Sequence, residues 1–329
     1  MFFFKLWYRF WRLISLLRGK QVTALLYNEQ CLCEQPDATN PENPKRIIAI
    51  LEALNTDHIS DKLKWVVSEM ATDTQIARVH QPSYISYLES LSQFDSVRHI
   101  DSDTVLNKSI FVAAKYSAGA VVKAVETVLR HKAVNAFCLI RPPGHHASSR
   151  KTQGFCLLNN TAIGVMHAFA QFRLKRIAII DFDAHHGDGT EEIFQDDERV
   201  MFFSSFQHPF FPFGGGQSSG SNPNIILSPL KAGSGSHVFR HIVQKTWLPK
   251  LKKFRPEMIF ICAGFDGHKD DPMSQLNFTE EDFIWITERL IEISYLYAKG
   301  RIVSVLEGGY ELKSLSKSVL CHIKTMAEY

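Results

Sequence analysis

The sequence carries little net charge. Across 329 residues the formal net charge is +3, and the first 20 residues supply five basic side chains and no acid, so the rest of the chain sums to −2. The five are Lys5, Arg9, Arg12, Arg18 and Lys20. Direct binding of nucleic acid needs a concentrated basic surface, and the body of this chain does not supply one. We therefore expect no nucleic-acid partner.

Cysteine is also scarce, and no two cysteines have the spacing of a disulfide framework or a zinc knuckle. Cys138 and Cys262 fall in apolar runs, where a small buried thiol is common, and the Cys31–Cys33 pair has no second Cys or His pair nearby. The other two are Cys156 and Cys321. The pattern predicts reduced thiols and an intracellular, cytoplasmic protein.

The chain lacks a linker rich in Pro, Gly and Ser, an internal repeat and a low-complexity tract. Its composition, 45% hydrophobic and 22% charged, is that of a globular protein with enough apolar material for a large core. We predict a single catalytic domain over residues 21–329, preceded by a separate segment.

Residues 1–20 predict a basic amphipathic helix. One face carries Phe3, Trp7, Phe10, Ile14 and Leu17 and the opposite face carries the basic side chains. Charges interrupt the apolar runs well before about 18 residues, so the segment cannot span a membrane. It could pack on the protein itself or on a second subunit of a homo-oligomer, lie on a membrane surface, or act as an organellar targeting sequence. The sequence leaves these alternatives open.

Helical and strand patterns alternate from about residue 21 onward. Buried parallel strands are predicted at 135–140, 176–182, 200–203, 224–227, 258–262 and 301–306. Helices are predicted near 110–131, 159–172, 237–254, 279–298 and 311–327. This alternation is typical of an α/β fold with an open, mainly parallel sheet and helices on both faces, giving three layers.

Polar residues follow five of these six runs. The segments are RPPGHH, DAHHGD, Ser204-Ser205, AGFD and EGGY. Because the carboxyl ends of parallel strands lie along one edge of a sheet, and ligands bind beyond that edge, we expect these segments to form one site.

A metal site is predicted from the second and fourth of these segments. Asp181 and Asp183 project to the same side of their strand, His185 can continue that side, and Asp266 can supply a further oxygen. Asp183, His185 and Asp266 would leave one position open for water, as catalytic sites do. Zinc is the expected ion, with Fe(II) as the alternative.

The adjacent histidines His145 and His146 follow two prolines that fix the turn. Asp181 and Asp188 remain to orient the two rings. A carboxylate on one imidazole nitrogen fixes the tautomer and raises the basicity of the other, which is what a general base needs.

Five motifs in order carry a family resemblance. RPPGHHA, GFCLLNN, DFDAHHGDGT, CAGFDGHKDDPM and LEGGY resemble the zinc-dependent histone deacetylase family of the arginase/deacetylase fold, most closely its bacterial and class II branches. The resemblance runs from about Tyr27 to the last predicted helix. Arginase itself is a poorer match, because DAHHGD lacks the spacing that binds two manganese ions.

The resemblance implies that the three predicted ligands hold zinc and that the enzyme removes acetyl groups from lysine side chains. His146, paired with Asp188, would be general base and acid, and His145, paired with Asp181, its electrostatic partner. Tyr310 would donate its hydroxyl to the scissile carbonyl. An acetylpolyamine or another small N-acyl compound is the rival substrate, and an idle acetyl-lysine binder is a third alternative.

The resemblance also implies a substrate channel and a second kind of ion. Gly154, Phe155 and Phe211 would flank a narrow tunnel for the acyl-lysine stem, Met273 would lie at its mouth, and Asp101 or its neighbour Asp103 would hold the substrate backbone. Asn40 stands where many relatives have His, so we expect contacts at the rim to differ. Potassium would be bound by Asp181, Asp183, the His185 carbonyl and Ser204, and a second site would use carbonyls near Phe194, Asp197 and Val200.

Overall fold

The computed structural model describes residues 22–328 with gaps at 38, 60–62, 94–95 and 217–221. The amphipathic helix predicted at residues 1–20 lies outside the described residues and stays a prediction. Within the described part of the chain, no helix is long and apolar enough to cross a membrane.

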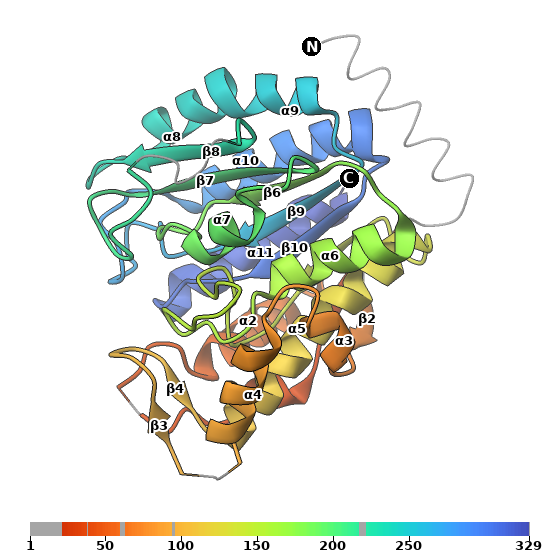
Figure 1. Cartoon of the computed structure of the whole chain (residues 1–329). Helices are drawn as coiled ribbons and strands as arrows, with labels where there is room; N and C mark the ends of the chain where they lie inside the picture. Colours follow the sequence, from red (N-terminus) through yellow and green to blue (C-terminus); the bar gives the residue numbers. More distant parts are fainter. Residues whose placement is uncertain (1–21, 38, 60–62, 94–95, 217–221, 329) are drawn as a thin grey trace.

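One parallel sheet of eight strands forms the centre of the molecule (Figure 1). Its strands are β1 (Thr23–Tyr27), β2 (Lys64–Val67), β5 (Asn135–Cys138), β6 (Ile177–Asp181), β7 (Val200–Gln207), β8 (Ile225–Leu230), β9 (Met258–Ala263) and β10 (Ile302–Leu306). They are ordered β2-β1-β5-β10-β9-β6-β7-β8, and every neighbouring pair is parallel. The six predicted strands are confirmed. β1 and β2 were not predicted.

The helices predicted from residue 110 onward are also present. The described α-helices are α2 (Lys45–Thr56), α3 (Asp73–Ile76), α4 (Pro82–Leu91), α5 (Lys108–Leu129), α6 (Asn160–Phe172), α7 (Asp188–Phe194), α8 (Ser236–Ile242), α9 (Leu248–Phe254), α10 (Glu280–Ile293) and α11 (Leu312–Glu328). Short π-helical turns at Val243–Trp247 and Ser294–Ala298 join α8 to α9 and extend α10. A 3-10 turn lies at Glu29–Leu32, and β3 (Arg98–His99) and β4 (Val105–Leu106) form a separate hairpin.

Successive side chains of each strand face opposite sides of the sheet, so a hydrophobic core forms on each face. In β6, Ala178 and Ile180 pack with residues of α2, α8, α9, α10 and α11, whereas Ile177 and Ile179 pack with residues of α5, α6 and α7. Figure 1 shows α8 and α9 on one side of the sheet and α5 and α6 on the other. The predicted three-layer α/β architecture is therefore confirmed.

β10 holds the two halves of the sheet together. On one side it pairs with β5, and on the other with β9. All five of its residues are buried. β10, the last strand in sequence order among the described residues, thus occupies a central position in the sheet.

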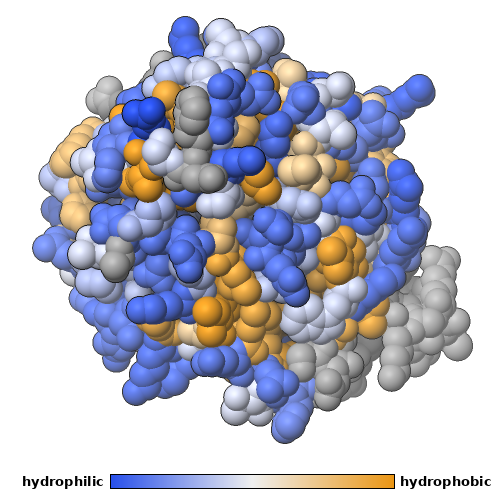
Figure 2. Space-filling model, turned by 90° about the horizontal axis from the view of Figure 1, so that it is seen from below, coloured by the Kyte–Doolittle hydropathy of each residue, from blue (hydrophilic) through white to orange (hydrophobic). Residues whose placement is uncertain are grey.

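In the view from below, apolar side chains gather in several groups, one of them a strip near the centre of the view, between hydrophilic side chains (Figure 2). Most of the exposed large hydrophobic side chains in the described ranges lie between residues 48 and 97. They are Ile48, Trp65, Val67, Met70, Tyr87 and Val97.

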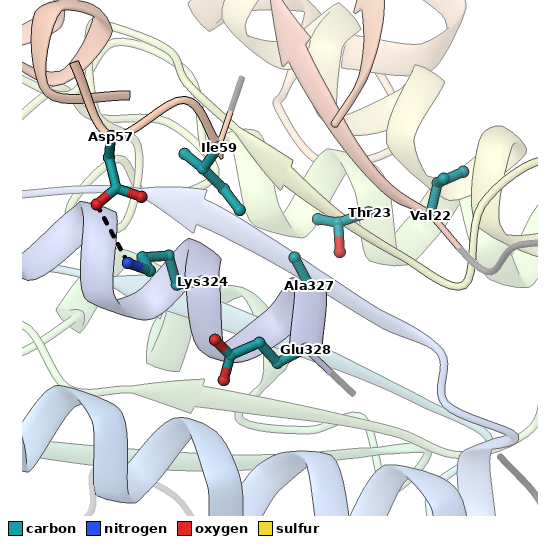
Figure 3. Close-up of a pocket in the computed structure, with 7 residues that line it drawn as sticks. All are labelled: Val22, Thr23, Asp57, Ile59, Lys324, Ala327 and Glu328. Carbon is teal, nitrogen blue, oxygen red and sulfur yellow. Dashed lines mark hydrogen bonds and ion pairs between the residues drawn. The ribbon is translucent and has the colours of Figure 1, made fainter. Parts of the chain in front are cut away.

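A cavity of about 370 Å³ opens at the amino-terminal edge of the sheet (Figure 3). Thr23 at the start of β1 lines it, together with the ion pair between Lys324 and Asp57 at 3.1 Å. The motif-bearing strand ends lie at the opposite, carboxyl-terminal edge. This cavity is therefore separate from the predicted site.

Candidate active site

The predicted site residues follow adjacent strands in the middle of the sheet. The order β5-β10-β9-β6 brings together segments that are more than a hundred residues apart in sequence. His145 and His146 follow β5, Tyr310 follows β10, Asp266 follows β9, and Asp183 and His185 follow β6. The sheet order thus explains why these motifs converge.

Asp183, His185 and Asp266 form a buried cluster whose ligand atoms all lie within 4.8 Å of one another. The Nδ1 atom of His185 lies 3.1 Å from Oδ1 of Asp183 and 3.0 Å from Oδ2 of Asp266. The other oxygen of each carboxylate accepts a backbone N–H, from Gly308 for Asp183 and from Ala184 for Asp266, each at 2.8 Å. The backbone therefore fixes both carboxylates with one oxygen directed at the imidazole.

Two glycines leave room for this cluster. A Cβ atom on Gly264 would lie 1.9 Å from Asp183 Oδ2, and one on Gly308 would lie 2.2 Å from Asp266 Oδ2. Any larger residue at either position would displace a carboxylate. The close approach of backbone to both acids is therefore a requirement of the site.

The cluster has the electrostatics of a cation site. Burial and the neighbouring carboxylate of Asp183 raise the pKa of Asp266 to about 6. Asp181 and Glu307 add two further buried acids, and burial raises the pKa of Glu307 to about 7. A divalent cation bound by Asp183, His185 and Asp266 would compensate this charge, and the oxygen and nitrogen donors fit zinc or iron.

The two histidines are each paired with the predicted carboxylate. Nδ1 of His145 lies 3.1 Å from Oδ2 of Asp181, and Nδ1 of His146 lies 2.8 Å from Oδ1 of Asp188. Gln153 donates to the second oxygen of Asp188 at 2.8 Å. Both imidazoles are therefore oriented through Nδ1, which leaves Nε2 of each for chemistry.

The two imidazoles differ in charge. Burial would lower the pKa of His145, but the carboxylates of Asp183 and Asp181 outweigh it and hold the pKa well above its ordinary value. Burial and the neighbouring His145 lower the pKa of His146 to about 4, against the opposing effect of Asp188. These shifts favour a protonated His145 beside a neutral His146, whose Nε2 could then accept a proton.

Tyr310 lies on a loop fixed from two sides. Its backbone N–H and that of Glu311 donate to Oδ2 of Asp271, at 2.6 and 3.0 Å. Its ring lies 5.8 Å from that of Phe155 and carries the guanidinium of Arg46 at 4.8 Å from its centre. Burial raises the pKa of Tyr310 well above its ordinary value, so the hydroxyl keeps its proton and remains a donor.

A buried cluster of Glu42, Arg46 and Arg141 holds the Tyr310 loop by hydrogen bonds to its backbone. Arg46 donates to the Gly309 carbonyl at 2.6 Å and to the Glu307 carbonyl. Arg141 binds both oxygens of Glu42, at 2.8 and 3.0 Å. These bonds join the loop between β1 and α2, called the first loop below, to the turn before His145 and to the Tyr310 loop.

Replacing Glu42 with alanine is expected to lower the free energy of unfolding by about 3–5 kcal/mol. The change leaves two guanidinium groups buried without their carboxylate, which costs more than a lost surface pair. Urea unfolding followed by circular dichroism measures the effect. Glu52→Ala, at an exposed position of α2, is the matched control and should stay within about 0.5 kcal/mol. Equal stability of the two variants would show that the cluster contributes nothing.

The predicted channel residues lie around the histidines and Tyr310. Phe211 packs its ring 5.3 Å from that of His146 and 6.1 Å from that of His185. Gly154 has a φ of +51°, and a Cβ there would lie 2.6 Å from the His146 ring and 3.2 Å from Phe211. Phe155 lies on the Tyr310 side. The structure therefore brings Gly154, Phe155 and Phe211 to the site.

The rim is built by the β3–β4 hairpin and the first loop. Oδ1 of Asp101 accepts the N–H groups of Asp103 and Thr104, so part of its carboxylate closes its own turn. Thr104 in turn accepts the N–H of Phe155 at 3.1 Å. Asn40 is buried and donates to the Asp103 carbonyl at 3.2 Å. The Asn that stands in place of His therefore ties the first loop to the hairpin.

Met273 and the candidate potassium ligands are also placed. Met273 is half-buried, and its N–H donates to Asp271, which also holds the Tyr310 loop.

Ser204, a candidate potassium ligand, was predicted to follow its strand. This is wrong, because β7 continues to Gln207 and Ser204 pairs with Asp181 inside the sheet. Its hydroxyl lies 3.0 Å from Nδ1 of His186. At the second predicted site, the Phe194 and Asp197 carbonyls accept the N–H groups of Asp197 and Val200, each at 3.0 Å.

Several buried polar residues that support the site were not predicted from the sequence. Besides Glu42, Arg46 and Arg141, they include Glu307, whose Oε2 accepts the N–H groups of Gly144 and His145 at 2.7 and 3.2 Å. Arg141 lies in the motif RPPGHHA and Glu307 in LEGGY, each directly after an apolar run. A charged residue at the end of such a run was the available signal for these two, because burial of such a side chain requires a partner.

A histone deacetylase domain model matches residues 40–326, which is most of the chain. The chain belongs to the histone deacetylase family. This deacetylase is 36% identical over 301 residues to a probable deacetylase of Archaeoglobus fulgidus, covering 89% of this chain and 82% of that protein. Its family membership places it among the hydrolases that act on acetyl amides.

Two further comparisons extend this result. The deacetylase is 33% identical over 335 residues to the human polyamine deacetylase HDAC10, covering 92% of this chain and 48% of that protein, so it spans about half of that relative. Its structure is similar to the crystal structure of the HDA15 HD domain, with a TM-score of 0.87, 30% identity, and coverage of 93% of this chain and 89% of that one.

Proposed function

We propose that this deacetylase hydrolyses the acetyl amide of acetylated lysine side chains in proteins or peptides, with zinc as its metal. The observation that carries the proposal is the convergence of a three-ligand cluster, a carboxylate-oriented imidazole pair and the Tyr310 loop between two phenylalanines. Amide hydrolysis needs a polarised carbonyl, a base for water and a donor to the carbonyl oxygen, and this arrangement can supply all three.

The metal would be held by Asp183, His185 and Asp266. Zinc, when bound, supplies a Lewis acid for the acetyl carbonyl and lowers the pKa of a water molecule towards about 7. Asp181, Asp183, the His185 carbonyl and Ser204 are proposed to hold potassium beside it, as the resemblance to the family implies.

His146 is proposed to move the proton. With Nδ1 bonded to Asp188, Nε2 takes a proton from the attacking water and returns it to the leaving lysine nitrogen. His145, held by Asp181, contributes positive charge at a ring-to-ring distance of 4.0 Å. The Tyr310 hydroxyl donates to the carbonyl oxygen as negative charge develops there.

The channel favours an extended aliphatic stem. Phe211 and Phe155 approach the site from the His146 side and the Tyr310 side, so a methylene chain between them would exclude water from the reacting carbonyl. Met273 adds an apolar side chain at the mouth. These features fit the side chain of acetyl-lysine.

An acetylpolyamine is the second candidate substrate. It offers the same acylated aliphatic amine, and the human relative HDAC10 is named a polyamine deacetylase. A polyamine carries a further ammonium group that would need an acidic partner; Met273 offers none at the mouth, and Oδ1 of Asp101 at the rim already accepts two backbone N–H groups. These features support acetyl-lysine as the first candidate.

The test compares both substrates on the same enzyme. The protein is stripped with a chelator and reloaded with Zn²⁺ or Fe²⁺, and acetate release is measured from acetyl-lysine peptides and from acetylated polyamines. We expect no release by the stripped protein, recovery with zinc, and a higher kcat/KM for the peptides. A higher kcat/KM for the polyamines would replace the proposed substrate, and full activity of the stripped protein would remove the metal from the proposal.

A further inference from the structure

A phenylalanine outside the proposed channel is unusually exposed. The loop after β7 carries three phenylalanines, of which Phe210 stacks on His185 at 5.6 Å and Phe211 packs on His146. The third, Phe213, has 78% of its surface exposed. An aromatic side chain left in water forgoes the stabilisation that burial of its apolar surface would contribute.

The backbone holds Phe213 in this position. Its φ is +65°, in the left-handed region that bulky side chains rarely adopt. Its N–H donates to the Phe210 carbonyl at 2.6 Å, which closes the turn between them. Strained backbone of this kind is concentrated at sites that bind ligands. Exposure and strain therefore occur at one residue beside the active site.

Phe213 continues one wall of the channel outward. Its ring lies 6.5 Å from that of Phe211, edge to face, and Phe211 contacts both His146 and His185. A substrate whose acetyl group reaches these histidines leaves the channel past Phe211. Because Phe213 is exposed and its ring lies next to that of Phe211, it is within reach of the part of the substrate that follows next.

The surroundings of Phe213 favour an apolar contact. The segment HPFFPFGGG, residues 208–216, contains no acidic or basic side chain other than a histidine at its start. An ammonium group could lie over the ring, but it would find no carboxylate on this loop. An apolar side chain of the substrate that packs on Phe213 would remove apolar surface of both groups from water. The adjacent Pro212 extends the apolar surface of the loop.

We propose that Phe213 is a specificity-determining residue that binds an apolar side chain next to the acetylated lysine of a peptide substrate. The inference rests on the proposed function, since it assigns a sequence preference to that same reaction. The preference follows from burial of two apolar surfaces in the complex and needs no additional catalytic group.

The test uses two peptides, one with leucine and one with glycine on both sides of acetyl-lysine. For the unaltered enzyme we expect kcat/KM to be about tenfold higher for the leucine peptide, which corresponds to about 1.4 kcal/mol. Phe213→Ala should bring this ratio close to one, mainly through a higher KM for the leucine peptide. Phe213→Tyr retains the ring and should retain the ratio. Tyr87→Ala, an exposed aromatic on α4, is the control and should not change it.

Two kinds of result would overturn the inference. A ratio near one for the unaltered enzyme, or the same ratio in Phe213→Ala, would show that Phe213 binds no neighbouring side chain while leaving the proposed function intact. Hydrolysis of an acetylpolyamine with no acetate released from either peptide would overturn the proposed substrate and the inference with it.

Discussion

Replacing Asp266 with alanine is expected to abolish both zinc binding and acetate release. Asp266 supplies one of the three converging ligand atoms, and its second oxygen accepts the Ala184 N–H beside Asp183. The change therefore removes a ligand and loosens the segment that carries the other two. Metal content measured by mass spectrometry after dialysis, together with an acetate assay, tests both effects on one sample.

The matched control for this variant is Asp270→Ala, four residues further along the chain. Its side chain is 59% exposed and lies outside the three-ligand cluster. We expect it to keep a full equivalent of zinc and its activity. Full zinc occupancy in Asp266→Ala would remove Asp266 from the ligand set, even if the variant were inactive.

Replacing Tyr310 with phenylalanine is expected to lower kcat by about 10²–10³ and to leave KM little changed. The ring and its contacts with Phe155 and Arg46 are retained, and only the hydroxyl is lost. A donor that acts on charge developing in the transition state contributes this much to rate and little to substrate binding. Steady-state kinetics with an acetyl-lysine peptide measures both constants.

Tyr87→Phe is the control, because Tyr87 is an exposed tyrosine on α4 away from the site. Its kcat and melting temperature should match those of the unaltered protein. If Tyr310→Phe kept its kcat, the tyrosine would be a packing residue, and the donor to the carbonyl oxygen would have to be sought elsewhere.

The strands and helices after residue 110 were predictable because the hydrophobic pattern of each segment fits one kind of secondary structure. Each of the six apolar runs is short and is buried on both faces, as a parallel strand between helices must be. The exposed edge strand β2, with the sequence KWVV, has no such signature, since only Val66 is not exposed. The β3–β4 hairpin has two residues in each strand, too few for any period to show.

The proposed catalytic and metal-binding groups were predictable for a different reason. Asp183, His185 and Asp266 are polar residues directly after buried strands, and parallel topology requires such residues to meet. The supporting residues could not be found in this way. Arg141 and Glu42 are 99 positions apart, and their pairing depends on the path of the loop between β1 and α2. Hydrophobic patterns within short segments contain no information on the path of this loop.

The place of β10 in the sheet also sets when the active site can exist during synthesis of the chain. β5 and β9 have no contact in the sheet until residues 302–306 are made, because β10 is the strand between them. The same strand leads directly to Tyr310 and its loop. A growing chain that has all three proposed metal ligands therefore still lacks the junction that aligns His145 and His146 with them. The proposed activity would then arise only after residues 302–310 are made, because they supply both β10 and Tyr310.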